Sequence, residues 1–325
     1  MILKKITTAG INWTQSNKTD RAWYSFCVTP TERIIAGSTR FIWYSDDNGI
    51  NWALTNKTDR AWYSLCVTPT GRVIAGSGGA GIWYSDDNGI NWTQSNKTNG
   101  DWYSLCVTPT GRIIAGSGEA GIWYSDDNGI NWTQSNMTNG QWYSFCVTPT
   151  GRIIAGSTKF IWYSDDNGIN WELTNKTDIA WFYLCVTPTG RIIAGSNDSH
   201  TAGIWYSDDN GINWALTNKT DGVWSSLCVT PTGRIIAGSS TSGVWYSDDN
   251  GINWALTNKT DGVWSSLCAT PTGRIIAGSG EAGIWYSDPD MLADTYEFPT
   301  YLDEAATQEL ITQLKAYADR ELGGN

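Results

Sequence analysis

The feature that most constrains this chain is an octapeptide that recurs about every forty residues along nearly its whole length. It reads Ser-Asp-Asp-Asn-Gly-Ile-Asn-Trp, and complete copies begin at Ser45, Ser85, Ser125, Ser164, Ser207 and Ser247. A seventh copy is divided between the ends of the repeat region, with its front half at 287–290 and its back half at 10–13. An open stack of repeats has no reason to begin and end inside one motif, whereas a ring does. The divided motif therefore predicts a ring closed by the N-terminal strand.

Each unit contains four segments typical of β-strands. In the second unit, 61–68 is rich in aromatic and β-branched residues and is expected to form the innermost strand. After a Pro-Thr-Gly turn, the apolar run 72–77 predicts a strand covered on both faces, and 82–85 and 91–95 complete the unit. Four strands in about forty residues are the period of a propeller blade. The chain is therefore predicted to be all-β, a seven-bladed β-propeller of four-stranded blades.

Within the octapeptide lies the pattern Ser-x-Asp-x-Gly-x-x-Trp, present as Ser45, Asp47, Gly49 and Trp52. It resembles the Asp-box, or BNR repeat, of sialidases and of related propellers such as the sortilin group and photosystem II assembly factors. In that family the box lies away from the active site, so the resemblance implies a sialidase-like fold and no chemistry. The aspartate is expected to accept backbone hydrogen bonds of its own turn, while the tryptophan packs between sheets. These structural aspartates are Asp47, Asp87, Asp127, Asp166, Asp209 and Asp249.

The repeat ends near residue 290, which predicts a propeller over 1–290 and a separate tail over 291–325. Apolar residues at three- and four-residue spacing in the tail predict a short amphipathic C-terminal helix. They are Leu310, Ile311, Leu314, Tyr317 and Ala318. Docking of this helix on the ring is the simpler expectation, and oligomerisation through it is the alternative.

One cysteine occupies the same position of the inner strand in every unit. Equivalent positions in neighbouring blades normally exceed the roughly 7 Å between Cα atoms that a disulfide allows. We therefore expect free, buried thiols at Cys27, Cys66, Cys106, Cys146, Cys185, Cys228 and Cys268. Free thiols and an N-terminal apolar run too short for a signal peptide favour folding in the cytoplasm, although the sequence leaves the location unknown.

The net charge of −11 disfavours unspecific binding to nucleic acid or to an anionic membrane, and no transmembrane segment is predicted. The expected partner is a glycan or a protein. The copies differ mainly in two loops, exemplified by 38–40 and 20–22 in the first unit. In a four-stranded blade both loops emerge on one side of the disc, here called the variable face. The opposite side, the box face, carries the near-constant turn and the octapeptide.

The inner strands begin at the variable face with aromatic pairs in four units, but with Phe182, Ser225 and Ser265 at the tyrosine position in the others. We interpret these pairs as shallow pockets between blades in which a flat ring lies on an aromatic side chain. The alternative is drift of solvent-exposed loops. Three arginines on neighbouring loops could converge on an anion. The candidate ligand-binding residues are Trp23, Tyr24, Trp62, Tyr63, Trp102, Tyr103, Trp142, Tyr143, Arg21, Arg40 and Arg60.

No catalytic residue, metal or cofactor is predicted. A sialidase-like site needs a tyrosine, a glutamate and an arginine cluster, and no Tyr-Glu pair stands near the three arginines. Glu119 and Glu281 belong to the third and seventh units, too far apart for a retaining carboxylate pair about 5 Å apart. The only histidine, His200, lacks a nucleophile motif, and the acidic octapeptide lacks the spacing of a calcium loop.

The sequence therefore predicts a non-enzymatic, lectin-like multivalent binding module, with carbohydrate on the variable face as the leading ligand. Weak sites in several blades would combine by avidity. Two alternatives stay open: a protein-binding scaffold for assembly or host recognition, and a sialidase-like glycosidase.

Overall fold

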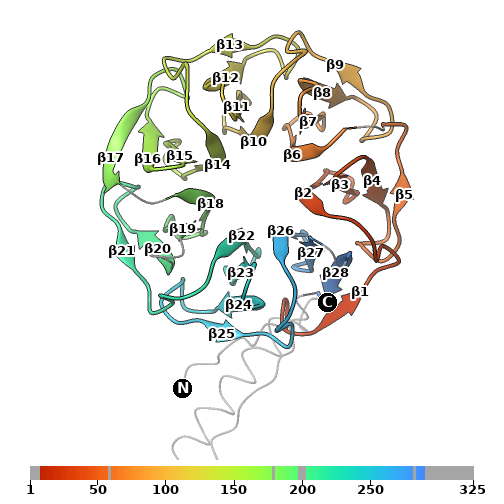
Figure 1. Ribbon diagram of the computed structural model, residues 1–325, viewed down its shortest axis with the longest axis vertical. Helices are drawn as coiled ribbons and strands as arrows, with labels where there is room; N and C mark the ends of the chain where they lie inside the picture. The colour runs from red at the N-terminus through yellow and green to blue at the C-terminus, as the bar shows by residue number, and fades with distance from the viewer. Residues whose placement is uncertain (1–7, 58–59, 178–179, 197–202, 281–282, 290–325) are drawn as a thin grey trace, which may run out of the picture. The chain divides into compact units, whose positions relative to one another are not determined.

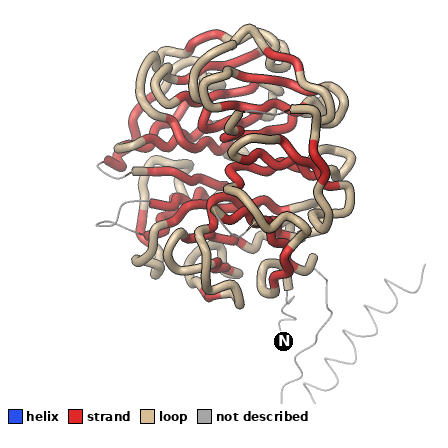
Figure 2. The backbone as a smooth tube through the Cα atoms, turned by 45° about the vertical axis from the view of Figure 1, so that its right-hand side comes forward, coloured by secondary structure: helices blue, strands red, loops and turns tan. Residues whose placement is uncertain are grey.

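A computed structural model describes residues 8–57, 60–177, 180–196, 203–280 and 283–289. These residues belong to one compact unit, 8–290, in which seven four-stranded antiparallel sheets surround a central channel (Figure 1). This part of the chain contains strands and loops and no helix (Figure 2). The chain is thus an all-β, seven-bladed propeller. The tail 291–325, with its predicted helix, lies outside the described residues, as do His200 and Glu281.

In every blade the strands run from the channel outwards in the order inner, second, third and outer. The first blade is β2 (Trp23–Val28), β3 (Ile34–Ser38), β4 (Ile42–Ser45) and β5 (Ala53–Leu54). The second is β6 (Trp62–Val67), β7 (Val73–Ser77), β8 (Ile82–Ser85) and β9 (Thr93–Gln94). The third is β10 (Trp102–Val107), β11 (Ile113–Ser117), β12 (Ile122–Ser125) and β13 (Thr133–Gln134).

The remaining blades follow the same order. The fourth is β14 (Trp142–Val147), β15 (Ile153–Ser157), β16 (Phe160–Ser164) and β17 (Glu172–Thr177). The fifth is β18 (Trp181–Val186), β19 (Ile192–Ser196), β20 (Gly203–Ser207) and β21 (Ala215–Leu216). The sixth is β22 (Trp224–Val229), β23 (Ile235–Ser239), β24 (Val244–Ser247) and β25 (Ala255–Leu256). The seventh is β26 (Trp264–Ala269), β27 (Ile275–Ser279), β28 (Ile284–Ser287) and β1 (Trp13–Gln15).

The seventh blade combines both ends of the repeat region. Strand β1 pairs antiparallel with β28, with Trp13 opposite Ser287 and Gln15 opposite Trp285 (Figure 1). The pairing extends past the strand, because Ser16 N–H donates to the carbonyl of Ile284 at 2.9 Å. The outer strand of this blade therefore comes from the beginning of the chain.

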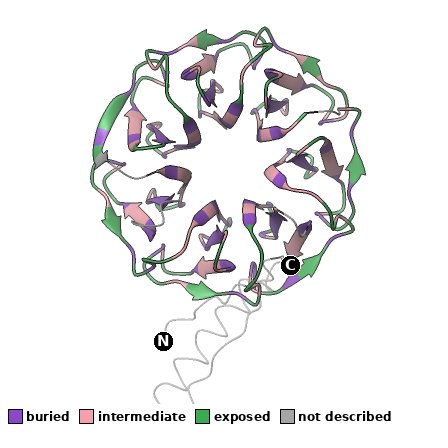
Figure 3. Cartoon of the chain, viewed as in Figure 1, coloured by how far each residue is buried: buried purple, intermediate pink, exposed green. Residues whose placement is uncertain are grey.

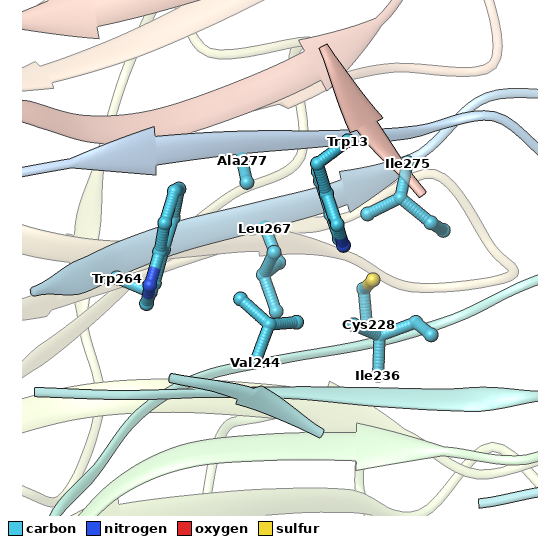
Figure 4. Close-up of a cluster of buried hydrophobic side chains, with 8 residues drawn as sticks. All are labelled: Trp13, Cys228, Ile236, Val244, Trp264, Leu267, Ile275 and Ala277. Carbon is cyan, nitrogen blue, oxygen red and sulfur yellow. The ribbon is translucent and has the colours of Figure 1, made fainter. Parts of the chain in front are cut away.

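The core consists of layers between neighbouring blades. All residues of the second strands are buried, as the unbroken apolar run predicts, whereas the outer strands are largely exposed (Figure 3). One such layer joins the sixth and seventh blades, where the Trp13 and Trp264 rings lie 6.2 Å apart (Figure 4). Burial of the large apolar side chains in these layers is the main stabilising term of the ring.

The octapeptide folds into a turn held by its aspartate. In the third blade, Asp127 accepts hydrogen bonds from Ser125 Oγ at 2.9 Å, from Asn131 N–H at 2.8 Å and from Asn131 Nδ2 at 2.6 Å. Gly129 has a φ of 88°, which glycine adopts without strain. The Trp132 indole N–H donates to the Gly129 carbonyl at 3.1 Å, so the turn also orients the buried tryptophan.

Arginines on the box face connect each turn to the next blade. The Arg72 guanidinium binds both carboxylate oxygens of Asp86 in its own blade, at 2.6 and 2.9 Å, and donates to the Asn128 carbonyl of the next blade at 3.0 Å. It also lies 4.3 Å from the ring centre of Tyr84. In return, Asn128 Nδ2 donates to Thr70 Oγ1 at 2.9 Å. The arginine pair with its own aspartate occurs in the first six blades.

The seventh blade departs from this arrangement. Its turn contains Pro289 in place of the box aspartate. Arg274 still donates to the Asn48 carbonyl of the first blade at 3.2 Å. Its Nε, however, is buried with no hydrogen-bond partner among the described residues. The seventh blade thus lacks the ion pair within the blade, but its junction with the first blade keeps both bonds, since Asn48 Nδ2 also donates to Thr272 Oγ1 at 3.2 Å.

All seven cysteines are free. Cys146 and Cys228 are buried, but the other five are half-buried, so full burial was predicted wrongly for them. The reason is their place in the inner strands, which border the channel.

Candidate binding face

The two kinds of variable loop adjoin at one end of each blade. In the second blade, Gly78 N–H donates to the Ala61 carbonyl at 2.9 Å, and in the third, Gly118 N–H donates to the Asp101 carbonyl at 3.0 Å. These bonds join the loop between the second and third strands to the loop that enters the inner strand. Variation among the repeats therefore concentrates on one face, away from the box turns.

Four of the candidate ligand-binding residues do not reach this surface. Trp23, Trp62 and Trp102 are 0% exposed and Trp142 is 2% exposed, so the prediction that they line pockets is wrong. The Trp102 ring packs 6.5 Å from the outer Trp132 of its own blade. Large apolar rings gain most from burial, and here the layers between blades have room for them.

The aromatic residues that directly follow the first tryptophan of five inner strands form one continuous structure. We call it the aromatic collar, and its members are Tyr24, Tyr63, Tyr103, Tyr143 and Phe182. Ring centres of successive members lie 5.3, 5.3, 5.5 and 4.2 Å apart across five neighbouring blades. The first two contacts are edge-to-face, with interplanar angles of 61° and 62°. The rings therefore touch one another and do not enclose separate pockets between blades.

Glycines of the variable loops leave the space that two collar rings occupy. A Cβ at Gly78 would lie 2.9 Å from Tyr63 Cε2, and one at Gly118 would lie 2.7 Å from Tyr103 Cε2. Both distances are shorter than real contacts, so a larger residue would displace the ring. Gly280 occupies the same position in the seventh blade, where Ser265 replaces the aromatic residue.

The collar is interrupted in the sixth and seventh blades. We call this interruption the gap, and define it by Val223, Ser225, Val263 and Ser265. The Ser225 hydroxyl donates to the Trp264 carbonyl at 2.7 Å. Val263 is 41% exposed, which is high for a valine. The gap thus exposes methyl groups beside hydroxyl groups.

Tyr183 was missed by the sequence interpretation. The other six inner strands have serine at its position, and Ser64 Oγ, for example, donates to the Trp102 carbonyl of the next blade at 3.0 Å. Tyr183 is half-buried, and burial raises the pKa of its phenol to about 12. Comparison of the repeats within the chain would have found it, because it is the one departure at an otherwise constant position.

The three candidate arginines occupy loops of the first two blades. Arg21, with a φ of 79°, pairs with Asp20 at 3.0 Å and lies 4.6 Å from the ring centre of Phe41. Arg60 N–H donates to the Arg40 carbonyl at 3.3 Å, and both side chains are exposed. The structure therefore brings the Arg40 and Arg60 loops together, while Arg21 already has a partner.

The phenols of Tyr63, Tyr103 and Tyr143 are hydrogen-bond donors at neutral pH. Burial, followed by nearby tyrosines and Asp101, raises the pKa of Tyr63, and burial with Asp101, Tyr143 and Glu119 raises that of Tyr103. Tyr143 OH donates to Gln141 Oε1 at 2.8 Å. No group of three or more His, Cys, Asp or Glu side chains able to hold a metal occurs in the described residues, and no helix there could cross a membrane.

A cavity of about 1010 Å³ opens at the other end of the channel, on the box face. It is lined by the Val-Thr-Pro segments that end the inner strands, such as 67–69, with Ala269 in place of valine in the seventh blade. The threonine hydroxyls bond within their own turns, as Thr68 and Thr70 do at 3.0 Å. None of the candidate ligand-binding residues lines this cavity.

The blades, the box turns and the collar define the class of protein: a seven-bladed propeller with its variable residues on one face. Six segments match the BNR/Asp-box repeat, at 43–54, 83–94, 123–134, 162–173, 205–216 and 245–256. The chain is a BNR/Asp-box repeat propeller. A comparison with curated proteins gives no match.

Three solved structures illustrate the likeness of fold. YCF48 bound to a D1 peptide superposes with a TM-score of 0.70 at 18% identity, covering 90% of this chain and 99% of that one. The extracellular domain of the putative one component system BT4673 from B. thetaiotaomicron has a TM-score of 0.70 at 12% identity, and 88% of this chain spans only 40% of it. Virginiamycin B lyase from Staphylococcus aureus has a TM-score of 0.69 at 11% identity, covering 85% and 98%. At these identities the likeness concerns the fold alone.

Proposed function

We propose that this protein is a non-enzymatic carbohydrate-binding module whose ligand binds on the variable face. The aromatic collar is the observation that carries the proposal. Sugars present apolar C–H faces that pack on aromatic rings and hydroxyls that need hydrogen-bond partners. The collar offers both, because its phenols are donors and Asp101, Glu119 and Gln141 supply acceptors nearby.

A non-catalytic role agrees with the charge arrangement of the described residues. The arginine-aspartate pairs recur in six blades, and repeated pairs between strands are structural contacts. A catalytic site is unique within a chain and combines groups with unequal pKa values. Incubation with fluorogenic glycosides, including a sialoside, is expected to release no fluorophore, and turnover would establish the glycosidase alternative instead.

A glycan array tests the function. The wild-type protein is expected to bind a subset of glycans, and a variant in which all five collar residues become serine is expected to lose that binding. Serine is tolerated at this position, because Ser225 and Ser265 occupy it. Asp127→Ala is the control, since it weakens a box turn and leaves the variable face intact. Binding that survives the collar variant but disappears when Arg21, Arg40 and Arg60 become alanine would indicate an anion site instead.

Binding of a protein is the second candidate function, and the outer rim favours it. Leu173, Leu216 and Leu256 lie on the outer strands of three neighbouring blades and are 43%, 39% and 41% exposed. In the second and third blades the same position is Gln94 and Gln134. One structural neighbour, YCF48, was solved with a bound peptide. If the rim binds a protein, changing these leucines to glutamine should abolish co-sedimentation with that partner and leave glycan binding unchanged.

We further infer that the N-terminal strand closes the ring in solution. The inference is supported by the pairing of β1 with β28 and by the bond from Arg234 Nη1 to the Ala9 carbonyl, at 2.7 Å, which ties the same segment to the sixth blade.

A further inference from the structure

The aromatic collar has two ends, and both face the gap. Each ring inside the collar contacts a collar ring in both neighbouring blades. Phe182 and Tyr24 each contact a collar ring in one neighbouring blade, Tyr143 and Tyr63 respectively. Beyond these ends, β22 and β26 carry Ser225 and Ser265 (Figure 1). The gap is therefore a stretch of two blades with an aromatic residue on either side.

The residues of the gap are small, and they change together. Where the gap has Val223 and Val263, the second to fourth blades have Ala61, Asp101 and Gln141. Serine replaces tyrosine in the same two blades, so no other ring refills the space. An aromatic side chain covers about 150–250 Å² when buried, and two are missing here. The gap thus provides room, methyl groups and hydroxyl groups between two aromatic side chains.

Tyr183 adds a donor beside the gap. It follows Phe182 on β18, the strand next to β22 in the ring, and the two rings lie 6.5 Å apart. Burial keeps this phenol protonated, because it raises the pKa to about 12. Tyr183 is also the one aromatic residue at a position that is serine in the other six blades.

Among the described residues, the two aspartates in the loops that enter the blades of the gap are paired. Asp221 binds Lys219 at 2.7 Å and Asp261 binds Lys259 at 2.9 Å, each within the loop that enters its blade. Both lysines also stack on tryptophans, Trp245 and Trp285. From the residues that the structure describes, a ligand in the gap therefore meets apolar surface and neutral hydroxyl groups, which offer no partner for a charge.

We propose that the gap binds one neutral pyranose ring, with Phe182 and Tyr24 as its aromatic walls and Tyr183 as a hydroxyl donor. The proposal rests on the carbohydrate-binding function above and narrows it to one site in each chain. The sugar takes the place of the two missing rings, its C–H face packs on an aromatic side chain, and its hydroxyls meet Ser225, Ser265 and Tyr183.

Filling the gap tests the proposal. Ser265→Tyr introduces the tyrosine that the first four blades have at this position. Gly280 leaves space for the new ring, as Gly78 and Gly118 do for Tyr63 and Tyr103. This variant is expected to fold like the wild type and to lose at least about tenfold in affinity for a neutral oligosaccharide identified on the array. Thr133→Ala is the matched control. It likewise introduces a residue that other blades carry at the same position, but on the exposed outer strand β13, and we expect its affinity to stay within about twofold of the wild type.

The Tyr183 variants provide a second, independent measurement. Tyr183→Ser restores the residue of the other six blades, and Tyr183→Phe removes the hydroxyl alone. Both are expected to weaken binding about fivefold or more while the melting temperature changes little. Native mass spectrometry should find one oligosaccharide per chain.

The outcomes separate this proposal from the function on which it rests. If the wild type binds no glycan, the carbohydrate-binding function fails. If it binds several sugars per chain, or if a change in the collar outside the gap, Tyr103→Ser, weakens binding as much as Ser265→Tyr does, the function stands and the single site in the gap is wrong. Should Ser265→Tyr fail to fold, unchanged binding by both Tyr183 variants would overturn the proposal.

Discussion

At the scale of single residues, the box aspartates are held as carboxylates by their own turns. Burial alone raises the pKa of Asp127, but hydrogen bonds from the Asn131 backbone and side chain, from Ser125 and from the Ile130 backbone outweigh it, so the pKa lies below its ordinary value. The same balance lowers the pKa of Asp47, Asp87, Asp166, Asp209 and Asp249. Each of these six carboxylates is therefore stabilised by the folded state.

This balance predicts loss of stability in acid. Because the folded pKa values are depressed, the stabilisation is fully present above the unfolded value of about 3.9 and is lost as pH falls through the folded values. We expect the free energy of unfolding in urea to be similar at pH 7 and pH 5 and clearly lower at pH 3. Asp127→Asn should reduce this dependence on pH, since it removes one of the titrating groups. A stability that is equal at pH 3 and pH 7 would contradict the account.

The repeats also offer a comparison of two arginines in equivalent positions. Both Arg72→Ala and Arg274→Ala remove the bond to the next blade and a contact with a tyrosine ring, but only Arg72→Ala also removes an ion pair, the one with Asp86. Asp86 is largely exposed, so its pair contributes about 1 kcal/mol at most. Denaturant unfolding is expected to show Arg72→Ala as the more destabilising change by about that amount. Equal effects would mean that the pair adds nothing.

The sequence predicted the position of a residue better than its burial. The tyrosine position was correctly assigned to the start of the inner strand, but the neighbouring Trp62 was expected at the surface and is 0% exposed. A bulge between Trp62 and Ser64 shifts the register there, so simple alternation of sides does not apply. The collar is built from contacts between aromatic rings of different blades. These contacts depend on the curvature of the propeller, so no local sequence pattern predicts them.

At the scale of strands, the repeat predicted the architecture, because every blade packs the same four segments in the same order. The four strands and their order match the segments expected from composition, such as 72–77 for β7 (Val73–Ser77). The outer strands are shorter than expected, and five of the seven outer strands, unlike β1 and β17, contain two residues. Their exposed side chains bury little apolar surface, so few residues hold a regular strand there.

Removal of the closing strand should open the ring. Deletion of residues 1–16 takes away β1 and exposes the edge of β28, and an exposed edge strand associates with other chains. We expect this variant to melt at a lower temperature and to aggregate as protein concentration rises, as measured by light scattering. Deletion of residues 1–7 is the control, because it keeps β1 and the Ala9 carbonyl that binds Arg234. If the longer deletion melted and sedimented like the full chain, the N-terminal strand would not close the ring.

At the scale of the whole molecule, the seven free cysteines follow the channel. Burial raises the pKa of Cys106, Cys185 and Cys268 to about 12, so their thiols are protonated and unreactive at neutral pH. Titration with a thiol reagent is expected to be slow in the folded protein and to find seven groups after denaturation. A count of five or fewer without reductant would show that a disulfide forms.

Association of whole molecules stays a prediction of the sequence. The tail 291–325 is outside the described residues, and its amphipathic pattern predicts either docking or contact between copies. Sedimentation velocity of the full chain and of residues 1–290 would distinguish the two.

The junctions between blades are built from one set of residues, so neighbouring blades are chemically interchangeable. The bond from Asn128 to Thr70 joins the third and second blades, and the equivalent bond from Asn88 to Thr31 joins the second and first. A gene with such similar repeats can gain or lose one by unequal recombination. The blades that become neighbours would then form the same hydrogen bonds with each other. The variable face, with the collar and its gap, would record the event, because most of the differences between blades lie there. Selection for a ligand, rather than for folding, is therefore what would keep the order of the blades constant.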